Sequence, residues 1–95
     1  MFCVVRQYSG EGASHLFDEI EGVLDQVEPL IRGVPGFVSY TLFRTADGGI
    51  SVTVCQDKSG TDESVRIASE FIRDNLTAQA SPPVVSEGVT TLHLI

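Results

Sequence analysis

Three polar residues on predicted strands could perform chemistry: Tyr40, His93 and Arg44. A buried phenol needs a hydrogen-bond partner, an imidazole titrates near neutral pH and can act as a base, and a guanidinium stabilises negative charge on an oxygen. We take these three as candidate catalytic residues, with Arg6 as a second arginine able to hold a carboxylate. The structural alternatives are a core tyrosine, a histidine at an interface or rim, and arginines that are solvated or paired with some of the thirteen acids.

Two cysteines, Cys3 and Cys55, form a candidate redox pair. Antiparallel pairing would bring the start of the first strand beside the end of the strand that carries Cys55, so we expect the two thiols to be neighbours. A reversible disulfide requires matching geometry, and the alternative is a pair of buried thiols. Two cysteines without spaced histidine partners make no zinc site, so no metal is expected.

Length and charge limit the classes of protein to consider. A chain of 95 residues, 42% hydrophobic and 20% charged, predicts one globular domain over residues 1–95, with a small core. The net charge of -7 would repel a phosphate backbone and an anionic membrane, which argues against nucleic acid or a membrane as a partner. The apolar start of the chain has no basic residues before it and no run approaches a membrane span, so we expect a cytoplasmic protein with reduced thiols.

Hydrophobic periodicity predicts two helices. Apolar residues recur at helical spacing from Leu16 to Gly33, with Ser14 as the expected cap and Pro29 loosening the last turn. A second helix is expected over residues 61–76, capped by Thr61 after a loop at residues 57–60.

Four segments are predicted as strands, the last of them bent at Gly88 and preceded by a linker over residues 78–83: residues 2–8, 37–44, 50–56 and 84–95. The order of elements is then βαββαβ. This order predicts an α+β, ferredoxin-like fold, in which two helices pack on one face of a four-stranded antiparallel sheet.

The register of the central hairpin decides which side chains share a face. A three-residue loop ending at Gly48 would place Thr45 opposite Gly49. With that register the helix side of the hairpin would form a substrate pocket near Tyr40, lined by Leu42, Val52 and Val54. The other face is expected to meet a second copy of the chain in a homodimer, and would carry Ser39, Thr41, Phe43, Ser51, Thr53 and Cys55.

Several segments of the chain carry a resemblance to a known family. They are the long first helix running into Val34-Pro35-Gly36-Phe37, the two hairpin strands, and the entry to the second helix through Thr61-Asp62-Glu63-Ser64. Over nearly its whole length the chain resembles the antibiotic biosynthesis monooxygenase-like members of the dimeric α+β barrel superfamily. The resemblance implies a dimeric α+β barrel, built from two packed sheets, with a pocket between sheet and helices in each subunit.

The sequence also departs from the active branches of that family. Members that oxidise aromatic molecules use Trp, Asn, Tyr and Arg around the substrate, and this chain has no Trp. Haem-degrading members ligate iron through a histidine on the second helix, with an asparagine on the first strand. Residues 61–76 contain no histidine and residues 2–8 no asparagine, so the resemblance disfavours haem degradation, and no cofactor is expected.

Two functions follow as hypotheses. The resemblance implies a cofactor-independent monooxygenase that acts on a small apolar or aromatic molecule, in which the substrate supplies the electrons to dioxygen and the protein supplies a dry pocket. The alternative is a dimeric module that binds a small ligand or another protein without catalysis. Whether the chain is an enzyme stays open at the level of sequence, because a fold does not transfer a reaction.

Overall fold

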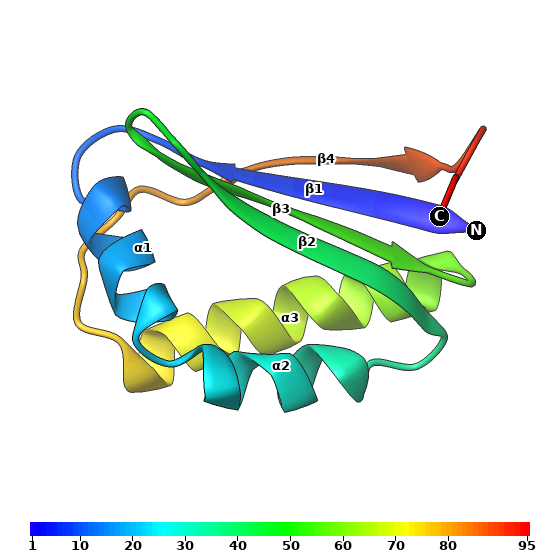
Figure 1. The fold of residues 1–95 in the computed structure, drawn as a ribbon, viewed down its shortest axis with the longest axis horizontal. Coiled ribbons are helices and arrows are strands. Elements are labelled where there is room, and N and C mark those ends of the chain that lie inside the picture. The colour runs from blue at the N-terminus through cyan, green and yellow to red at the C-terminus, as the bar shows by residue number, and fades with distance from the viewer.

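Four strands and three helices make up the chain, in the order βααββαβ, and the computed structural model describes residues 1–95. The strands form one antiparallel sheet in the order β2-β3-β1-β4, and the three helices lie on one face of it (Figure 1). The predicted ferredoxin-like architecture is confirmed, with one helix more than expected. The elements are β1 (Phe2–Tyr8), α1 (Ala13–Glu21), α2 (Leu24–Arg32), β2 (Phe37–Thr45), β3 (Gly48–Cys55), α3 (Lys58–Asn75) and β4 (Val84–Val89).

The prediction of one long first helix was wrong, because the chain breaks between α1 and α2 at Gly22 and Val23. The N–H of Gly22 donates to the Glu19 carbonyl at 3.1 Å, and the N–H of Val23 donates to the Ile20 carbonyl at 3.0 Å. These bonds reach three residues back, so they tighten and end the first helix. Figure 1 shows the change of direction that follows. The apolar spacing continues across the break, which is why periodicity alone indicated a single helix.

The first helix begins after Gly12 rather than at the expected cap, Ser14. Gly12 has a φ of 85°, in the left-handed region that favours glycine. A Cβ atom at this position would also lie only 2.0 Å from the backbone oxygen of Gln79. The start of α1 is therefore decided by the close approach of a distant segment, which capping patterns in the sequence do not report.

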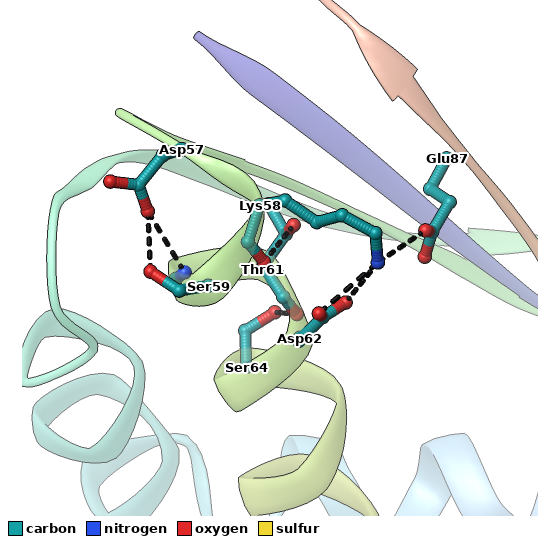
Figure 2. A network of polar contacts seen from close by, with 8 residues as sticks. Asp57, Lys58, Ser59, Thr61, Asp62, Ser64 and Glu87 are labelled. Atoms are coloured by element: carbon teal, nitrogen blue, oxygen red, sulfur yellow. Dashed lines mark hydrogen bonds and ion pairs between the residues drawn. The ribbon is translucent and has the colours of Figure 1, made fainter.

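The third helix begins three residues earlier than predicted, so Thr61 lies inside it and Asp57 is the cap. The Asp57 carboxylate accepts from the Ser59 hydroxyl at 2.6 Å and from the Gly60 N–H at 3.4 Å (Figure 2). The Lys58 ammonium reaches from this first turn to Asp62 and, on β4, to Glu87, each at 2.9 Å. The helix start is therefore tied to the sheet edge.

Replacing Asp57 with alanine should lower the melting temperature, on the order of 5 °C, because the cap is lost. The hydrogen bond from Ser59, with those from the backbone, lowers the pKa of Asp57 below its ordinary 3.8. The stability that this carboxylate adds is therefore present above pH 3.8 and lost as the pH falls through its lower folded-state pKa. Thermal melts of wild type and Asp57→Ala should converge in acid. A difference that persists there, or an equal loss in Glu11→Ala, an exposed acid without such bonds, would contradict the capping role.

The predicted register of the central hairpin was wrong by one residue. Thr45 pairs with Gly48 across a two-residue loop, and Arg44 pairs with Gly49. The ring of Phe17 lies where a side chain at position 49 would project, 2.1 Å from an ideal Cβ, so only the glycine fits the helix side at this point. Tertiary packing of α1 on the sheet therefore selected the register.

The shift exchanges the two faces of β3. Ser51, Thr53 and Cys55 face the helices and are at most 1% exposed, while the alternate residues Ile50, Val52 and Val54 lie on the other face. Tyr40 and Leu42 stay on the helix side, where they pair with Thr53 and Ser51. The sheet thus presents a row of polar residues to its own core.

The remaining part of the chain consists of β4 and the segments before and after it. β4 pairs with β1 in regular register through Gly88, so the expected bend there is absent, and the strand ends at Val89. The linker predicted at residues 78–83 carries no helix or strand. None of the helices is long and apolar enough to cross a membrane. The central core cluster consists of Tyr8, Ala13, Leu16, Phe17 and Ile20.

Candidate functional site

A cavity lies between the sheet and the helices, and its lining is mainly apolar. Side chains from all three helices close it against β1, β2 and β3, and twelve of its fourteen lining residues are hydrophobic. Its free volume is about 40 Å³, enough for a few water molecules. The lining consists of Arg6, Tyr8, Phe17, Ile20, Val27, Leu30, Ile31, Tyr40, Leu42, Ser51, Ile67, Ala68, Phe71 and Ile72.

A larger cleft, with a free volume of about 330 Å³, adjoins this cavity between α2 and β2. Four residues line both hollows: Val27, Ile31, Tyr40 and Leu42. The cleft also carries two charged residues of α2, Glu28 and Arg32, which pair with each other at 2.9 Å. The gap between α2 and β2 is therefore the route by which a ligand would reach the inner cavity.

The polar end of the cavity is built around Arg6. Its side chain is on the central strand β1, and only 3% of the residue is exposed. One terminal nitrogen donates to the Tyr8 hydroxyl at 3.2 Å, while Nε is buried without an acceptor. No carboxylate lies within ion-pair distance of Arg6, although the chain contains thirteen acids. The cavity thus contains a positive charge with no counter-charge in the protein.

Two tyrosines flank this arginine. The Tyr8 ring packs edge-on against Phe17, with 5.9 Å between the ring centroids, and its hydroxyl takes the bond from Arg6. Burial raises the pKa of the Tyr40 hydroxyl, and the positive charge of Arg6 acts in the opposite direction. Because burial has the larger effect, Tyr40 stays a neutral phenol at neutral pH, and it can donate a hydrogen bond to a molecule in the cavity.

Two hydroxyl groups of β3 add to the unused hydrogen-bonding capacity. Ser51 lies directly across from Arg6 in the register of β1 and β3, and Thr53 lies across from Tyr40 in the register of β2 and β3. Both hydroxyls are buried without a hydrogen-bond partner. Buried polar groups are usually paired, so the two unpaired ones that line the cavity, Nε of Arg6 and the hydroxyl of Ser51, mark this end of it as a site that a ligand could complete.

No family model matches the chain, and no curated protein matches it in sequence. Solved structures do match it. A monooxygenase from the gene ActVA-Orf6 of Streptomyces coelicolor, in complex with nanaomycin D, is 20% identical, with a TM-score of 0.67 over 99% of this chain and 90% of that one. SnoaB, a cofactor-independent oxygenase from Streptomyces nogalater, is 19% identical, with a TM-score of 0.63 over 98% and 95%.

Another solved structure with the same architecture contains bound porphyrins. A substituted form of MhuD, with two manganese protoporphyrin IX molecules per active site, is 15% identical, with a TM-score of 0.66 over 98% of this chain and 96% of that one. This chain has the antibiotic biosynthesis monooxygenase-like fold. The neighbours that share it belong to the dimeric α+β barrel superfamily, at low sequence identity.

Ligands of several kinds occupy this antibiotic biosynthesis monooxygenase-like fold, so the residues of each site must be considered individually. In this chain α3 contains no histidine. Nowhere do three or more His, Cys, Asp or Glu side chains gather in a way that could hold a metal ion. The histidine that the haem-degrading members carry on the second helix, according to the resemblance, is therefore absent from α3, and no histidine lines the cavity.

Of the residues predicted as a site, the cavity brings together Tyr40 and Leu42. Val52 and Val54 were expected to line it with them, but the one-residue shift of the hairpin places both on the opposite face of the sheet. Their place on the helix side is taken by Ser51 and Thr53. The pocket is therefore more polar on the sheet side than the sequence predicted.

Arg44 lies outside the cavity, at the surface between β2 and α1. Its guanidinium donates to the carboxylates of Asp18 at 2.7 Å and Glu21 at 3.1 Å, and to the backbone oxygen of Ser14 at 2.9 Å. The hydrogen bond that Arg44 donates to Asp18, with the neighbouring negative charges, raises the pKa of Arg44. These contacts hold α1 against the hairpin, and none of them reaches the cavity.

His93 also lies outside the cavity. It follows β4 in the segment after the last strand, and its Nε2 lies 3.3 Å from the hydroxyl of Ser39. Ser39 pairs with Val54, on the sheet face that points away from the helices. An imidazole at this position is on the wrong side of the sheet to exchange a proton with a molecule in the cavity.

Cys3 and Cys55 lie on adjacent strands but on opposite faces. Cys55 pairs with Phe2, and Cys3 pairs with Val54, so the alternation of side chains points the two thiols apart. Both cysteines are free, and burial raises the pKa of the Cys55 thiol. This arrangement does not suit a disulfide.

Mild oxidation should therefore leave the two cysteines unlinked within one chain. The intact mass after treatment with oxidised glutathione, measured on the unfolded and unreduced protein, should show no internal disulfide. Cys55 should also resist alkylation until the protein unfolds, because the thiolate is the reactive form and this thiol is buried. A rapid Cys3–Cys55 bridge in the folded protein would contradict the register of β1 and β3.

The polar lining residues that the sequence did not place at the site are Tyr8 and Ser51, and Arg6 was ranked behind Arg44. One signal was available for Arg6. In residues 2–8 it occupies the same face as Val4 and Tyr8, so a charge stands at a core position of an otherwise apolar strand. Ser51 carried no such signal, because its face depended on the hairpin register.

Proposed function

We propose that the protein is a homodimeric, cytoplasmic, cofactor-independent oxygenase, which oxidises a small aromatic molecule held in the cleft between α2 and β2 and in the inner cavity that adjoins it. The observation that carries the proposal is a mainly apolar cavity that adjoins a larger cleft and ends in buried, unpaired polar groups. The oxygenases with this fold, ActVA-Orf6 and SnoaB, support it as an analogy. The two free cysteines are compatible with a reducing compartment.

The proposed reaction requires the protein only to bind the substrate and to donate hydrogen bonds to it. A substrate with an activated CH₂ group and one molecule of dioxygen would give a ketone and one molecule of water, with all four electrons coming from the substrate. The apolar walls would exclude bulk water, and the neutral phenol of Tyr40 would donate to an oxygen that gains negative charge. Tyr40 is the proposed catalytic residue, while Arg44 and His93 have no part in this site.

Oxygen uptake tests this function. The purified protein, without added metal or cofactor, should consume dioxygen in a one-to-one ratio with an anthrone, a three-ring ketone whose central CH₂ group is activated. Tyr40→Phe should lower kcat by about a hundredfold, the low end for loss of a proton-transfer group, and Thr41→Val on the other face of the same strand should not. Wild-type protein that binds the anthrone but consumes no dioxygen above the spontaneous rate would overturn the proposal.

The second candidate function is binding without catalysis. It is favoured by one observation: no carboxylate, imidazole or thiol is among the residues that line the cavity, so the site lacks an ordinary general base. A binding protein would return the anthrone unchanged after prolonged incubation with dioxygen, whereas an oxygenase would convert it to the quinone.

The homodimer is supported by the sheet face that points away from the helices. This face presents apolar residues on three strands: Val5, Phe43, Ile50 and Val52, of which Phe43 is 44% exposed. A patch of this kind on a small domain is typical of a protein interface. Light scattering should give twice the chain mass of 10.2 kDa at micromolar concentration. Val52→Glu should give monomers and Leu24→Glu, on the exposed side of α2, should not, and a monomeric wild type would contradict the dimer.

A further inference from the structure

We propose that Arg6 binds an anionic oxygen, and that the natural ligand is an aromatic molecule carrying a carboxylate, phenolate or enolate. The proposal rests on the proposed function in one respect: it uses the same cavity. It adds the charge of the ligand and the residue that recognises it.

The arginines of the chain differ in one decisive way. Arg32, Arg44, Arg66 and Arg73 each pair with at least one carboxylate, and each side chain is at least 33% exposed. Arg6 has no such partner and is 3% exposed. An arginine stays protonated in proteins, and a buried charge without a counter-ion is strongly unfavourable. The missing counter-ion is therefore expected from a bound molecule.

The groups around Arg6 suit an oxygen anion. Nε of Arg6 and the hydroxyl of Ser51, its direct neighbour across the strands, are both buried and unpaired. Tyr8 and Tyr40 line the same cavity, and the Tyr8 hydroxyl is already within hydrogen-bond distance of Arg6. These groups can all donate hydrogen bonds, and charge-assisted bonds from arginine are the strongest of them. An anionic oxygen would satisfy several of them at once.

The remainder of the cavity limits the ligand to a largely apolar body. The wall opposite the sheet consists of aliphatic and aromatic side chains, among them Ile20, Leu30, Ile67 and Phe71. A small hydrophilic anion such as phosphate would leave these surfaces in contact with water. A planar ring that carries one ionised oxygen would extend into the cleft between α2 and β2, whose free volume is about 330 Å³, and place its charged oxygen at Arg6 in the inner cavity.

The test compares two probes of nearly equal shape, 2-naphthoate and the neutral 2-naphthamide. Since the chain has no Trp, naphthalene fluorescence can be titrated without tryptophan emission. Wild type should bind the naphthoate about 10- to 100-fold more tightly, the range for a hydrogen bond to a charged group. Arg6→Met should bind both probes equally, Arg6→Lys should keep part of the preference, and the surface variant Arg44→Met should keep all of it.

Equal binding of the two probes by wild type, binding of neither, or a preference that survives in Arg6→Met would each overturn the proposal. A third probe, 2-naphthol, distinguishes the kinds of anionic oxygen. If its affinity rises with pH as its hydroxyl ionises, the natural ligand is a phenolate or enolate. If its affinity stays constant, the natural ligand is a carboxylate. The outcome is independent of catalysis. A preference for naphthoate without oxygen uptake would overturn only the oxygenase function, whereas oxygen uptake without the preference would overturn only the role of Arg6.

Discussion

Replacing Arg6 with methionine should make the unliganded protein more stable, by about 1–4 kcal/mol. Methionine has a similar length and fills irregular apolar space, so it keeps the packing of the side chain against Tyr8 and removes the desolvated charge. The result is unusual because most substitutions of a buried residue destabilise a protein. It is expected here because Arg6 has no carboxylate partner, and a residue that costs stability is often kept for function.

Urea unfolding at one fixed protein concentration measures this change, since a dimer would make stability depend on concentration. Arg44→Met is the matched control, because Arg44 is paired with Asp18 and Glu21 at the surface, and its loss should change stability little. A lower urea midpoint for Arg6→Met would mean that the buried guanidinium is satisfied in the free protein. In that case the free protein lacks no anion at this position.

Gly49→Ala should destabilise the protein severely, by about 3 kcal/mol, the upper part of the range for overpacking a core. The new methyl group would lie 2.1–2.5 Å from three atoms of the Phe17 ring, and the ring is 1% exposed in the central core. Neither group can move away without opening the contact between α1 and the sheet. Gly88→Ala is the control, because a Cβ there meets nothing within 4 Å.

A second substitution separates this clash from a general effect of alanine in the strand. Phe17→Leu removes the ring atoms that the methyl group would meet, so it should destabilise the wild type but cost much less in the Gly49→Ala background. A double-mutant cycle in urea would measure the coupling. Additive effects of the two substitutions would show that Phe17 does not select the register of the hairpin.

The candidate site could be predicted only in part from the sequence. The helix side of β2 was predicted correctly, so Tyr40 and Leu42 lie in the cavity, and Thr41 and Phe43 lie on the opposite face of the sheet. Val52 and Val54 lie outside the cavity, because the two-residue loop shifts β3 by one position relative to the predicted register. In a strand, a shift of one residue moves every side chain to the other face. The shift placed apolar residues outside and polar residues inside, which is the reverse of the usual pattern.

Arg44 and Arg6 are a second example of a site property that the sequence could not predict. Both are single arginines on predicted strands, and their sequence contexts do not say which one finds an acid. Arg44 meets Asp18 and Glu21 because α1 packs across the end of the hairpin. Arg6 meets none because β1 is flanked on both sides by other strands and covered by helices, and no acid lines the cavity.

The sequence by itself determined the fold, because period-two and helical spacing, together with turn residues, leave few ways to bury the apolar faces of a chain this short. It did not determine the break at Gly22, the cap at Asp57, the hairpin register or the isolation of Arg6. The break and the cap are made by local hydrogen bonds at residues whose types do not stand out in the sequence. The hairpin register and the lack of a counter-charge at Arg6 depend on contacts between segments distant in sequence, such as Phe17 over Gly49. Local sequence patterns carry no information on such contacts. In this protein these contacts decide which polar groups are buried without a partner and can bind a ligand.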